Sequence, residues 1–244
     1  MKLLRKLRLT PRLHKIDFII ILISTLVWGA AIYLRPSLIK TKCASTPMEC
    51  TAESVPKFDR AAIGFNNATA DEYSYFTQNL SGILALSVPP AWAGALAVFG
   101  KLMPATAIAW AATDLILVAE TTALNGMIGE LTKITVQRPR PFVYVNPSND
   151  GANPSNYISF YSGHTSYAAA STTAMFLILL SRNPPLIMLF ASALAIPTLT
   201  ILTGMLRVMA GRHFLTDVTA AAIIGSLIAL AVAYFHRPPL DEKE

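Results

Sequence analysis

The sequence predicts an all-α fold: an integral membrane bundle of six transmembrane helices, with short interfacial helices in the first outer loop. Hydrophobic residues make up 53% of the 244 positions and charged residues only 14%, whereas about a quarter of the residues in a soluble domain are charged. The apolar residues form six stretches, most of them close to the ~20 residues that a helix needs to cross ~30 Å of hydrocarbon. A basic block precedes the first stretch, and the shortest connections carry Lys or Arg, as expected on the cytoplasmic side of a membrane.

The six predicted spans cover residues 16–34, 81–100, 102–124, 166–180, 186–206 and 218–235. The fourth is short, and we expect it to begin at a Ser-Gly turn and to use residues 163–181. Residues 16–235 then form one membrane domain. A basic N-terminus (residues 1–15) and a short tail (residues 236–244) flank it, and both are expected to be cytoplasmic.

Six basic residues occupy the first fifteen positions: Lys2, Arg5, Lys6, Arg8, Arg12 and Lys15. Such an excess marks the cytoplasmic flank of a span, so we place the N-terminus inside and retain the first helix. A cleaved signal sequence is the alternative, but the apolar stretch is long for one and lacks a clear A-x-A site. The block directly adjoins a membrane span, which argues against a nucleic-acid-binding arm.

Counting crossings from a cytoplasmic N-terminus places the segments 35–80, 132–160 and 207–217 outside. The two tight connections that carry Lys101 and Arg182 come inside, where prolines mark them as turns. The 35–80 segment is rich in aromatic residues, and residues 59–79 can form short amphipathic helices at the interface. We interpret this segment as a cap near a site entrance, with a plain tether as the alternative.

The two cysteines, Cys43 and Cys50, fall in this outer loop. Disulfides persist in oxidising compartments, so we expect one to close this small loop. The alternative is two free thiols in a cytoplasmic loop. There is no C-x-x-C pair and no histidine-rich tract, so the sequence indicates no metal site and no cofactor.

Asp114 and Glu120 interrupt the apolar third span. Ionisable groups at membrane depth usually face the bundle interior and are paired. For Asp114 we favour a buried structural hydrogen bond over a proton path or a head-group contact. For Glu120 two interpretations stay open: a structural role, or a contact with one of the cations described next.

Three short segments carry the chemistry of this chain. They are KITVQRPRP from Lys133, YSGH from Tyr161, and RVMAGRHFLTD from Arg207. Together they supply three cations, a Ser-Gly turn, two histidines and a carboxylate. These are the groups needed to hold a phosphate, attack it and protonate the leaving oxygen, and the predicted topology places all three segments on the outer face.

The order and spacing of these segments resemble the type 2 phosphatidic acid phosphatase superfamily. Its motifs are K-x6-R-P, P-S-G-H and S-R-x5-H-x3-D. The matching residues are Lys133, Arg140, Pro141, Ser162, Gly163, His164, Arg207, His213 and Asp217. Tyr161 stands where the family usually has Pro, and Leu206 where it usually has Ser. The resemblance covers residues 133–217, about a third of the chain.

Each matching residue also has a physical reason to bind or cleave a phosphate. Arg140 and Arg207 can bind phosphate oxygens in bidentate fashion, and Lys133 adds a point charge. Ser162 and Gly163 precede a predicted helix, where backbone N–H groups bind anions. If the third helix continues past Thr132, Lys133 and Arg140 can share one face.

His213 and Asp217 are four residues apart and would share a face of the sixth helix, so Asp217 can accept from one imidazole nitrogen and leave the other free to attack phosphorus. His164 would protonate the leaving oxygen and then activate water. The resemblance implies the same roles, and it implies a reaction without a metal. Arg138 and Arg212 are extra cations that either select a head group or meet lipid phosphates at the interface, and we favour the second role slightly.

The sequence therefore predicts a membrane lipid phosphatase, with membrane lipids around it and a phosphorylated lipid as substrate. The family's range includes phosphatidylglycerophosphate, phosphatidate, undecaprenyl diphosphate and lipid A. A bacterial inner membrane with a periplasmic site fits the expected topology. A phosphotransferase and a non-catalytic lipid-binding or transport protein are the alternatives. The sequence sets neither the individual lipid nor the oligomeric state.

Overall fold

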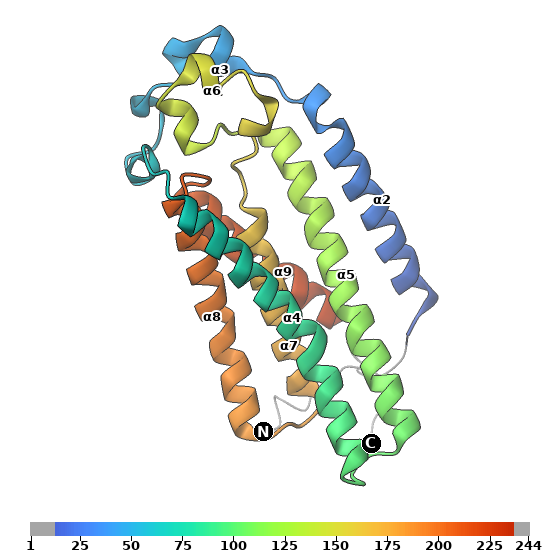
Figure 1. The fold of residues 1–244 in the computed structure, drawn as a ribbon. Coiled ribbons are helices and arrows are strands. Elements are labelled where there is room, and N and C mark those ends of the chain that lie inside the picture. Colours follow the sequence, from blue (N-terminus) through green and yellow to red (C-terminus); the bar gives the residue numbers. More distant parts are fainter. Residues whose placement is uncertain (1–12, 237–244) are drawn as a thin grey trace.

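The computed structural model describes residues 13–236, drawn in Figure 1. In this part of the chain six helices have 19 residues or more: α2 (Lys15–Leu38), α4 (Ala68–Val98), α5 (Pro104–Val136), α7 (Gly163–Ser181), α8 (Leu186–Met209) and α9 (Leu215–Phe235). The short elements are α3 (Lys42–Ser45), α6 (Pro147–Asp150) and the 3-10 helices η1 (Pro47–Glu49), η2 (Ala52–Ser54), η3 (Arg60–Ala62), η4 (Pro141–Tyr144) and η5 (Pro154–Asn156). The described residues form no strand, so the predicted all-α fold is confirmed. The basic block at residues 1–12 and the tail from residue 237 lie outside the described residues.

Five of the long helices are long and apolar enough to cross a membrane: α2, α4, α5, α8 and α9. The predicted fourth span corresponds to α7, which is 19 residues long and contains the run Ala168–Ala174 of small and hydroxyl-bearing residues. Helix α7 packs against α4, α5, α8 and α9, and most of its side chains are buried. Hydropathy alone therefore identifies five spans and does not confirm the predicted count of six, because the central helix meets its neighbours through small residues instead of facing lipid.

Two helices extend further than the sequence predicted. Helix α4 begins at Ala68, where the Asn67 side chain caps it by accepting from the Ala70 amide at 3.0 Å. The predicted short interfacial helices at residues 59–79 are therefore largely wrong, because residues 68–79 continue a membrane helix and the short helices occupy residues 42–62. Helix α5 runs to Val136 and ends at Gln137, which has a left-handed conformation (φ 49°). These extra turns bring Asp71 and Lys133 to the site described below.

The two ends of the bundle differ. At one end, which we call the motif end, α3 and α6 form an ordered cap (Figure 1). A disulfide joins Cys43 to Cys50 there. The buried Tyr157 hydroxyl accepts from the Cys43 amide at 2.8 Å and donates to the Gly151 carbonyl at 2.9 Å. These contacts join the loop between α2 and α4 to the loop between α5 and α7.

The opposite end, which holds the turns α4–α5 and α7–α8, contains a buried ion pair. Arg182 donates to Asp114 Oδ1 at 2.6 Å and lies over the Trp110 ring, with 4.6 Å between its guanidinium carbon and the ring centroid. Arg182 is only 4% exposed. Asp114 thus makes the buried structural contact that the sequence favoured, and its partner is the cation that the sequence placed in a tight turn.

Candidate active site

A cavity of about 280 Å³ opens at the motif end, where all three sequence motifs converge. Residues from α4, α5, α7, α8 and the connecting loops line it: Asp71, Tyr75, Lys133, Arg140, Ile158, Gly163, His164, Arg207, Arg212 and His213. Four of these ten residues are cations, two are histidines and one is a carboxylate. The composition of the wall therefore favours an anion.

Most of the cations in the cavity have a carboxylate partner. Lys133 donates to Glu130 Oε1 at 2.6 Å, and the other oxygen of Glu130 accepts from Arg35 at 2.9 Å. Arg207 and Arg212 both bind Asp71, the latter at 2.8 Å. These carboxylates hold the cations in fixed positions and reduce the net charge of the empty cavity.

Arg140 differs from the other cations of the cavity. It makes no ion pair with any residue of the described range 13–236. Its backbone amide donates to the Asn156 carbonyl at 2.8 Å, which fixes the chain where α5 has ended and η4 begins. Lys133 and Arg140 therefore reach the cavity from a helix and from the following loop, not from one continuous helical face.

The Ser-Gly turn starts α7, as the sequence predicted. Ser162 is the N-cap, and its Oγ accepts from the Thr165 amide (3.4 Å) and hydroxyl (3.0 Å). Ser162 is fully buried and does not line the cavity, whereas Gly163 does. A side chain at position 163 would place its Cβ 3.2 Å from Lys133 Nζ, so glycine keeps the wall open for both the lysine and an anion. Ser162 thus shapes the turn rather than presenting a hydroxyl to the cavity.

His213 lies in the loop just before α9, and its ring is held by the backbone. Its Nδ1 is 2.7 Å from the Ser159 carbonyl oxygen. A carbonyl can only accept, so Nδ1 carries the proton and Nε2 has a free lone pair. Burial, followed by the positive charges of Arg207 and Arg140, holds the pKa of His213 well below its usual value of 6.5. The ring is therefore neutral at physiological pH, the state that a nucleophile needs.

Asp217 does not hydrogen-bond to His213, contrary to the sequence prediction. Its nearest oxygen is 3.9 Å from His213 Nδ1, beyond hydrogen-bonding range. Asp217 accepts instead from the Ser159 hydroxyl at 2.5 Å, the Phe214 amide at 2.9 Å and the Arg138 guanidinium. Asp217 lies in the first turn of α9, two residues after the helix starts. From there its carboxylate accepts from the Phe214 amide at the helix start instead of from the His213 ring. It holds His213 indirectly, by fixing the two segments that carry Ser159 and His213.

Arg138 is not in the cavity, and it meets neither of the two expectations for it. It bridges Asp217 and Asp59, the latter at 2.8 Å, and lies over the Phe214 ring with 4.1 Å between its guanidinium carbon and the centroid. Arg212 does line the cavity. Of the two extra cations, only Arg212 can contact a bound anion.

His164, in the first turn of α7, lines the same cavity as His213. The Tyr75 ring packs edge-on against it, with 4.4 Å between the ring centroids. Its buried Nε2 has no hydrogen-bond partner among the described residues. The histidine is thus held in place by an aromatic contact while its ring nitrogen remains available to a ligand.

The comparison with known families agrees with this geometry. A family model described as the PAP2 superfamily matches residues 114–239, which is more than half of the chain. The chain belongs to the PAP2 superfamily. No curated protein and no solved structure matches it. The superfamily typically hydrolyses phosphate esters, which agrees with a cavity whose wall carries cations and histidines.

A second cavity, of about 350 Å³, extends the PAP2 site between the helices. The two cavities share Lys133, Gly163 and His164. The remaining wall comes from α2, α4, α5 and α7: Trp28, Gln78, Thr122, Asn125, Gly126, Gly129, Glu130, Ser166 and Tyr167. A side chain on Gly126 would overlap the Trp28 ring, with 2.4 Å between Cβ and Cδ2. The site therefore continues from a cationic pocket into a space lined by amide, hydroxyl and aromatic groups.

Sequence reasoning missed the carboxylates that support the site. Glu130 was detectable, since it precedes Lys133 by three residues, a spacing at which side chains meet on a helix. Asp71 and Asp59 had no local signal, because tertiary packing alone brings them to Arg207 and Arg138. The suggestion that Glu120 reaches a motif cation is wrong, because it faces a different cluster, with Asp17 and His236.

Proposed function

We propose that the protein is a membrane lipid phosphatase that cleaves a phosphate or diphosphate from a lipid head group through a phosphohistidine on His213. One observation carries the proposal. A single cavity holds the neutral His213, the facing His164 and four cations, with Asp71 as its only lining carboxylate within the described chain. These groups suit phosphoryl transfer, whose transition state places negative charge on the phosphoryl oxygens.

In the first step His213 Nε2 attacks phosphorus, and the bond from phosphorus to the lipid oxygen breaks. Protonated His164 donates its proton to that oxygen, so the lipid leaves as an alcohol or a lipid monophosphate. Burial and the charges of Arg207, Lys133 and Arg140 disfavour protonated His164 in the empty cavity. A bound phosphate dianion offsets these charges, so His164 gains its proton when the substrate binds. The hydrogen bond from His213 Nδ1 to the Ser159 carbonyl keeps the ring oriented as its charge increases.

In the second step a water molecule attacks the phosphohistidine, and His164 takes a proton from that water. The phosphorus–nitrogen bond breaks, inorganic phosphate leaves and His213 returns to its neutral form. His164 is again protonated for the next substrate. Both half-reactions therefore use the same pair of histidines in exchanged acid and base roles.

The cations of the cavity supply the charge stabilisation that other phosphatases obtain from metal ions. Arg140 is central to this proposal because it has no competing ion pair among the described residues. Arg207, Lys133 and Arg212 would exchange part of their contacts with Asp71 and Glu130 for phosphate oxygens. A reaction without a metal at this site follows from the cationic donor set.

The second cavity supports a lipid substrate over a soluble phosphate ester. It begins at Lys133 and His164 and passes between membrane-type helices toward Trp28 and Tyr167. A head group could contact its amide and hydroxyl groups while the acyl chains remain in the lipid. Phosphatidylglycerophosphate, phosphatidate, undecaprenyl diphosphate and lipid A are the candidate substrates.

The proposed location is a bacterial inner membrane, with the motif end facing the periplasm and both termini in the cytoplasm. The basic residues at the N-terminus support this orientation through the positive-inside rule. A reporter fused after Glu244 should be active only in the cytoplasm. Activity only on the periplasmic side would contradict the topology and the outward-facing site.

The decisive experiment measures phosphate release by detergent-purified protein from each of the four lipids, with and without EDTA. We expect release from at least one lipid, persistence in EDTA and loss in His213→Ala. Loss of activity in EDTA while the protein remains folded would contradict the proposed chemistry. Release only when an acceptor lipid or sugar is added would indicate a phosphotransferase. Folded protein that neither hydrolyses nor transfers phosphate would indicate a lipid-binding or transport protein.

A further inference from the structure

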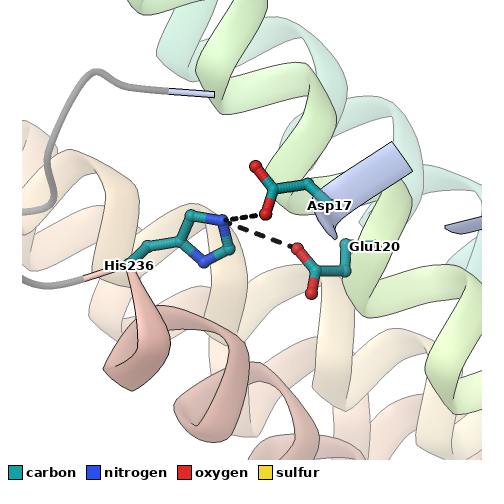
Figure 2. Close-up of side chains that lie close together, drawn as sticks. All are labelled: Asp17, Glu120 and His236. Atoms are coloured by element: carbon teal, nitrogen blue, oxygen red, sulfur yellow. Dashed lines mark ion pairs between the residues drawn. The ribbon is translucent and has the colours of Figure 1, made fainter. Parts of the chain in front are cut away.

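A second cluster of ionisable side chains lies away from the phosphate cavity. Asp17 near the start of α2, Glu120 midway along α5 and His236 directly after α9 converge at one point (Figure 2). They are 2%, 4% and 4% exposed, respectively. One ligand atom from each lies within 4.8 Å of the others. Burying two carboxylates together is costly unless a positive charge compensates them.

His236 directs one ring nitrogen at both carboxylates. Its Nδ1 is 2.9 Å from the Val232 carbonyl oxygen, so Nδ1 carries the proton in the neutral ring. Nε2 lies toward Asp17 and Glu120, as Figure 2 shows, and in the neutral ring this nitrogen carries the lone pair. Metal-binding histidines are typically oriented in this way, with the second ring nitrogen donating to a carbonyl or carboxylate.

The distances within the cluster fit a shared cation. His236 Nε2 is 3.4 Å from Asp17 Oδ1 and 3.6 Å from Glu120 Oε2, longer than the ~2.8 Å of a charge-assisted hydrogen bond. Around a tetrahedral ion with ligands at about 2.0–2.1 Å, neighbouring ligand atoms are about 3.3 Å apart. These two separations are therefore closer to the edges of a coordination tetrahedron than to direct hydrogen bonds.

The two carboxylates are also prepared for a ligand. Glu120 Oε2 is buried and has no hydrogen-bond partner among the described residues. The other oxygen of Asp17, Oδ2, accepts from the His14 amide at 2.8 Å, which leaves Oδ1 directed at the cluster. Two carboxylates and one neutral imidazole carry a formal charge of about −2, which a divalent ion neutralises.

We propose that Asp17, Glu120 and His236 form a structural binding site for a divalent metal ion of the Zn²⁺ type, with the fourth position open to water. The three ligands come from α2, α5 and the end of α9. Helix α2 packs mainly on α5. The ion would therefore link α2 to the end of α9 by way of Glu120 on α5. This site is separate from the phosphate cavity and does not rest on the proposed reaction.

The test uses full-length protein purified with a histidine-free tag and without chelator. Elemental analysis should find about one equivalent of zinc per chain, and Glu120→Gln should lose it. The matched control Glu72→Gln changes an exposed glutamate of α4 and should keep it.

Exchange with Co²⁺ gives a second measurement that requires no variant. Wild-type protein should show the intense visible absorption bands of a tetrahedral ion, and adding Zn²⁺ should abolish them. His213→Ala should bind the ion as wild type does, which separates this proposal from the proposed function. Zinc-free wild-type protein without a Co²⁺ spectrum would overturn the site and indicate an ion pair with protonated His236. Zinc retained by folded Glu120→Gln would overturn it as well.

Discussion

Two buried histidines, His213 and His236, make the same backbone contact in opposite electrostatic surroundings. Each directs Nδ1 at a main-chain carbonyl oxygen, at 2.7 Å and 2.9 Å, respectively. Around His213 the cavity wall is mainly cationic. Around His236 the neighbours are the carboxylates of Asp17 and Glu120. The same backbone contact is thus surrounded by cations in one place and by carboxylates in the other.

The tautomer of a histidine therefore does not determine its function. The carbonyl fixes which nitrogen has the lone pair, and the surrounding charges decide what that lone pair meets. Burial, followed by the positive charges of Arg207 and Arg140, keeps His213 neutral, and the same charges favour an anion in the cavity. At His236 the negative neighbours favour a positive charge, and in our proposal a divalent metal ion supplies it.

The largest expected effect concerns the nucleophile. His213→Ala should lower kcat for phosphate release by about 10⁴-fold or more, because the covalent route is lost. His14→Ala is the matched control and should leave kcat unchanged, since His14 is exposed and outside the cavity. Circular dichroism should show that both variants are folded. A folded His213→Ala protein with more than a tenth of wild-type activity would rule out the phosphohistidine.

The next largest effect is expected for Arg140, which has no ion pair among the described residues, and we compare it with Arg182, which has one. Arg140→Ala should lower kcat/KM by about 10²- to 10³-fold, since it removes a donor to the transition state. It should not lower Tm, because the guanidinium has no ion-pair partner among the described residues. Arg182→Ala should instead destabilise the fold by about 3–5 kcal/mol, since it leaves Asp114 buried and unpaired.

Thermal unfolding and steady-state kinetics on the same preparations test this comparison. A fall in Tm for Arg140→Ala comparable to that for Arg182→Ala would show that Arg140 is mainly structural.

Asp217 gives a third test, because its contacts connect it to the loops rather than to the His213 ring. Asp217→Asn should lower the free energy of unfolding by about 3 kcal/mol, since it weakens a buried ion pair with Arg138. Turnover should fall much less than in His213→Ala, because the Ser159 carbonyl still accepts from His213. If folded Asp217→Asn is as inactive as His213→Ala, then Asp217 acts directly on the imidazole during turnover.

The smallest expected effect is in the pH dependence. Because the pKa of His213 lies well below 6.5 in the folded protein, the acid limb of kcat/KM assigned to this residue should inflect below pH 6.5. The same shift affects stability: the unfolded chain binds a proton near pH 6.5 and the folded chain does not. His213 therefore contributes stability above that pH that is lost on acidification, about 1 kcal/mol by one pH unit lower.

Steady-state kinetics at several pH values measure the acid limb of kcat/KM. Denaturant titrations at the same pH values measure the free energy of unfolding. The same titrations on His213→Ala should show a smaller loss of stability between pH 6.5 and 5.5. An unchanged loss in that variant would mean that other groups cause the acid destabilisation.

The sequence was most informative where the signal is local. The apolar stretches at residues 16–34 and 218–235 correspond to α2 and α9, because hydropathy over about 20 residues is a property of the segment itself. The motif residues Lys133, His164 and Arg207 all line one cavity, since the tight turns at the opposite end bring the ends of these helices together at the motif end. The sequence was less informative about α7 as a span, because the small and hydroxyl-bearing residues of its buried interface lower its hydropathy.

The sequence by itself determined the all-α membrane class, the family and the motif residues, because composition, hydropathy and motif spacing need no partner. Only the tertiary structure decided which charges meet. Asp71 binds Arg207, which lies 136 positions away. Asp217 binds Arg138 instead of His213. The third cluster joins α2, α5 and the residue after α9: Asp17, Glu120 and His236. Side-chain pairing of this kind depends on how helices pack in space, and the order of residues along one helix does not encode it.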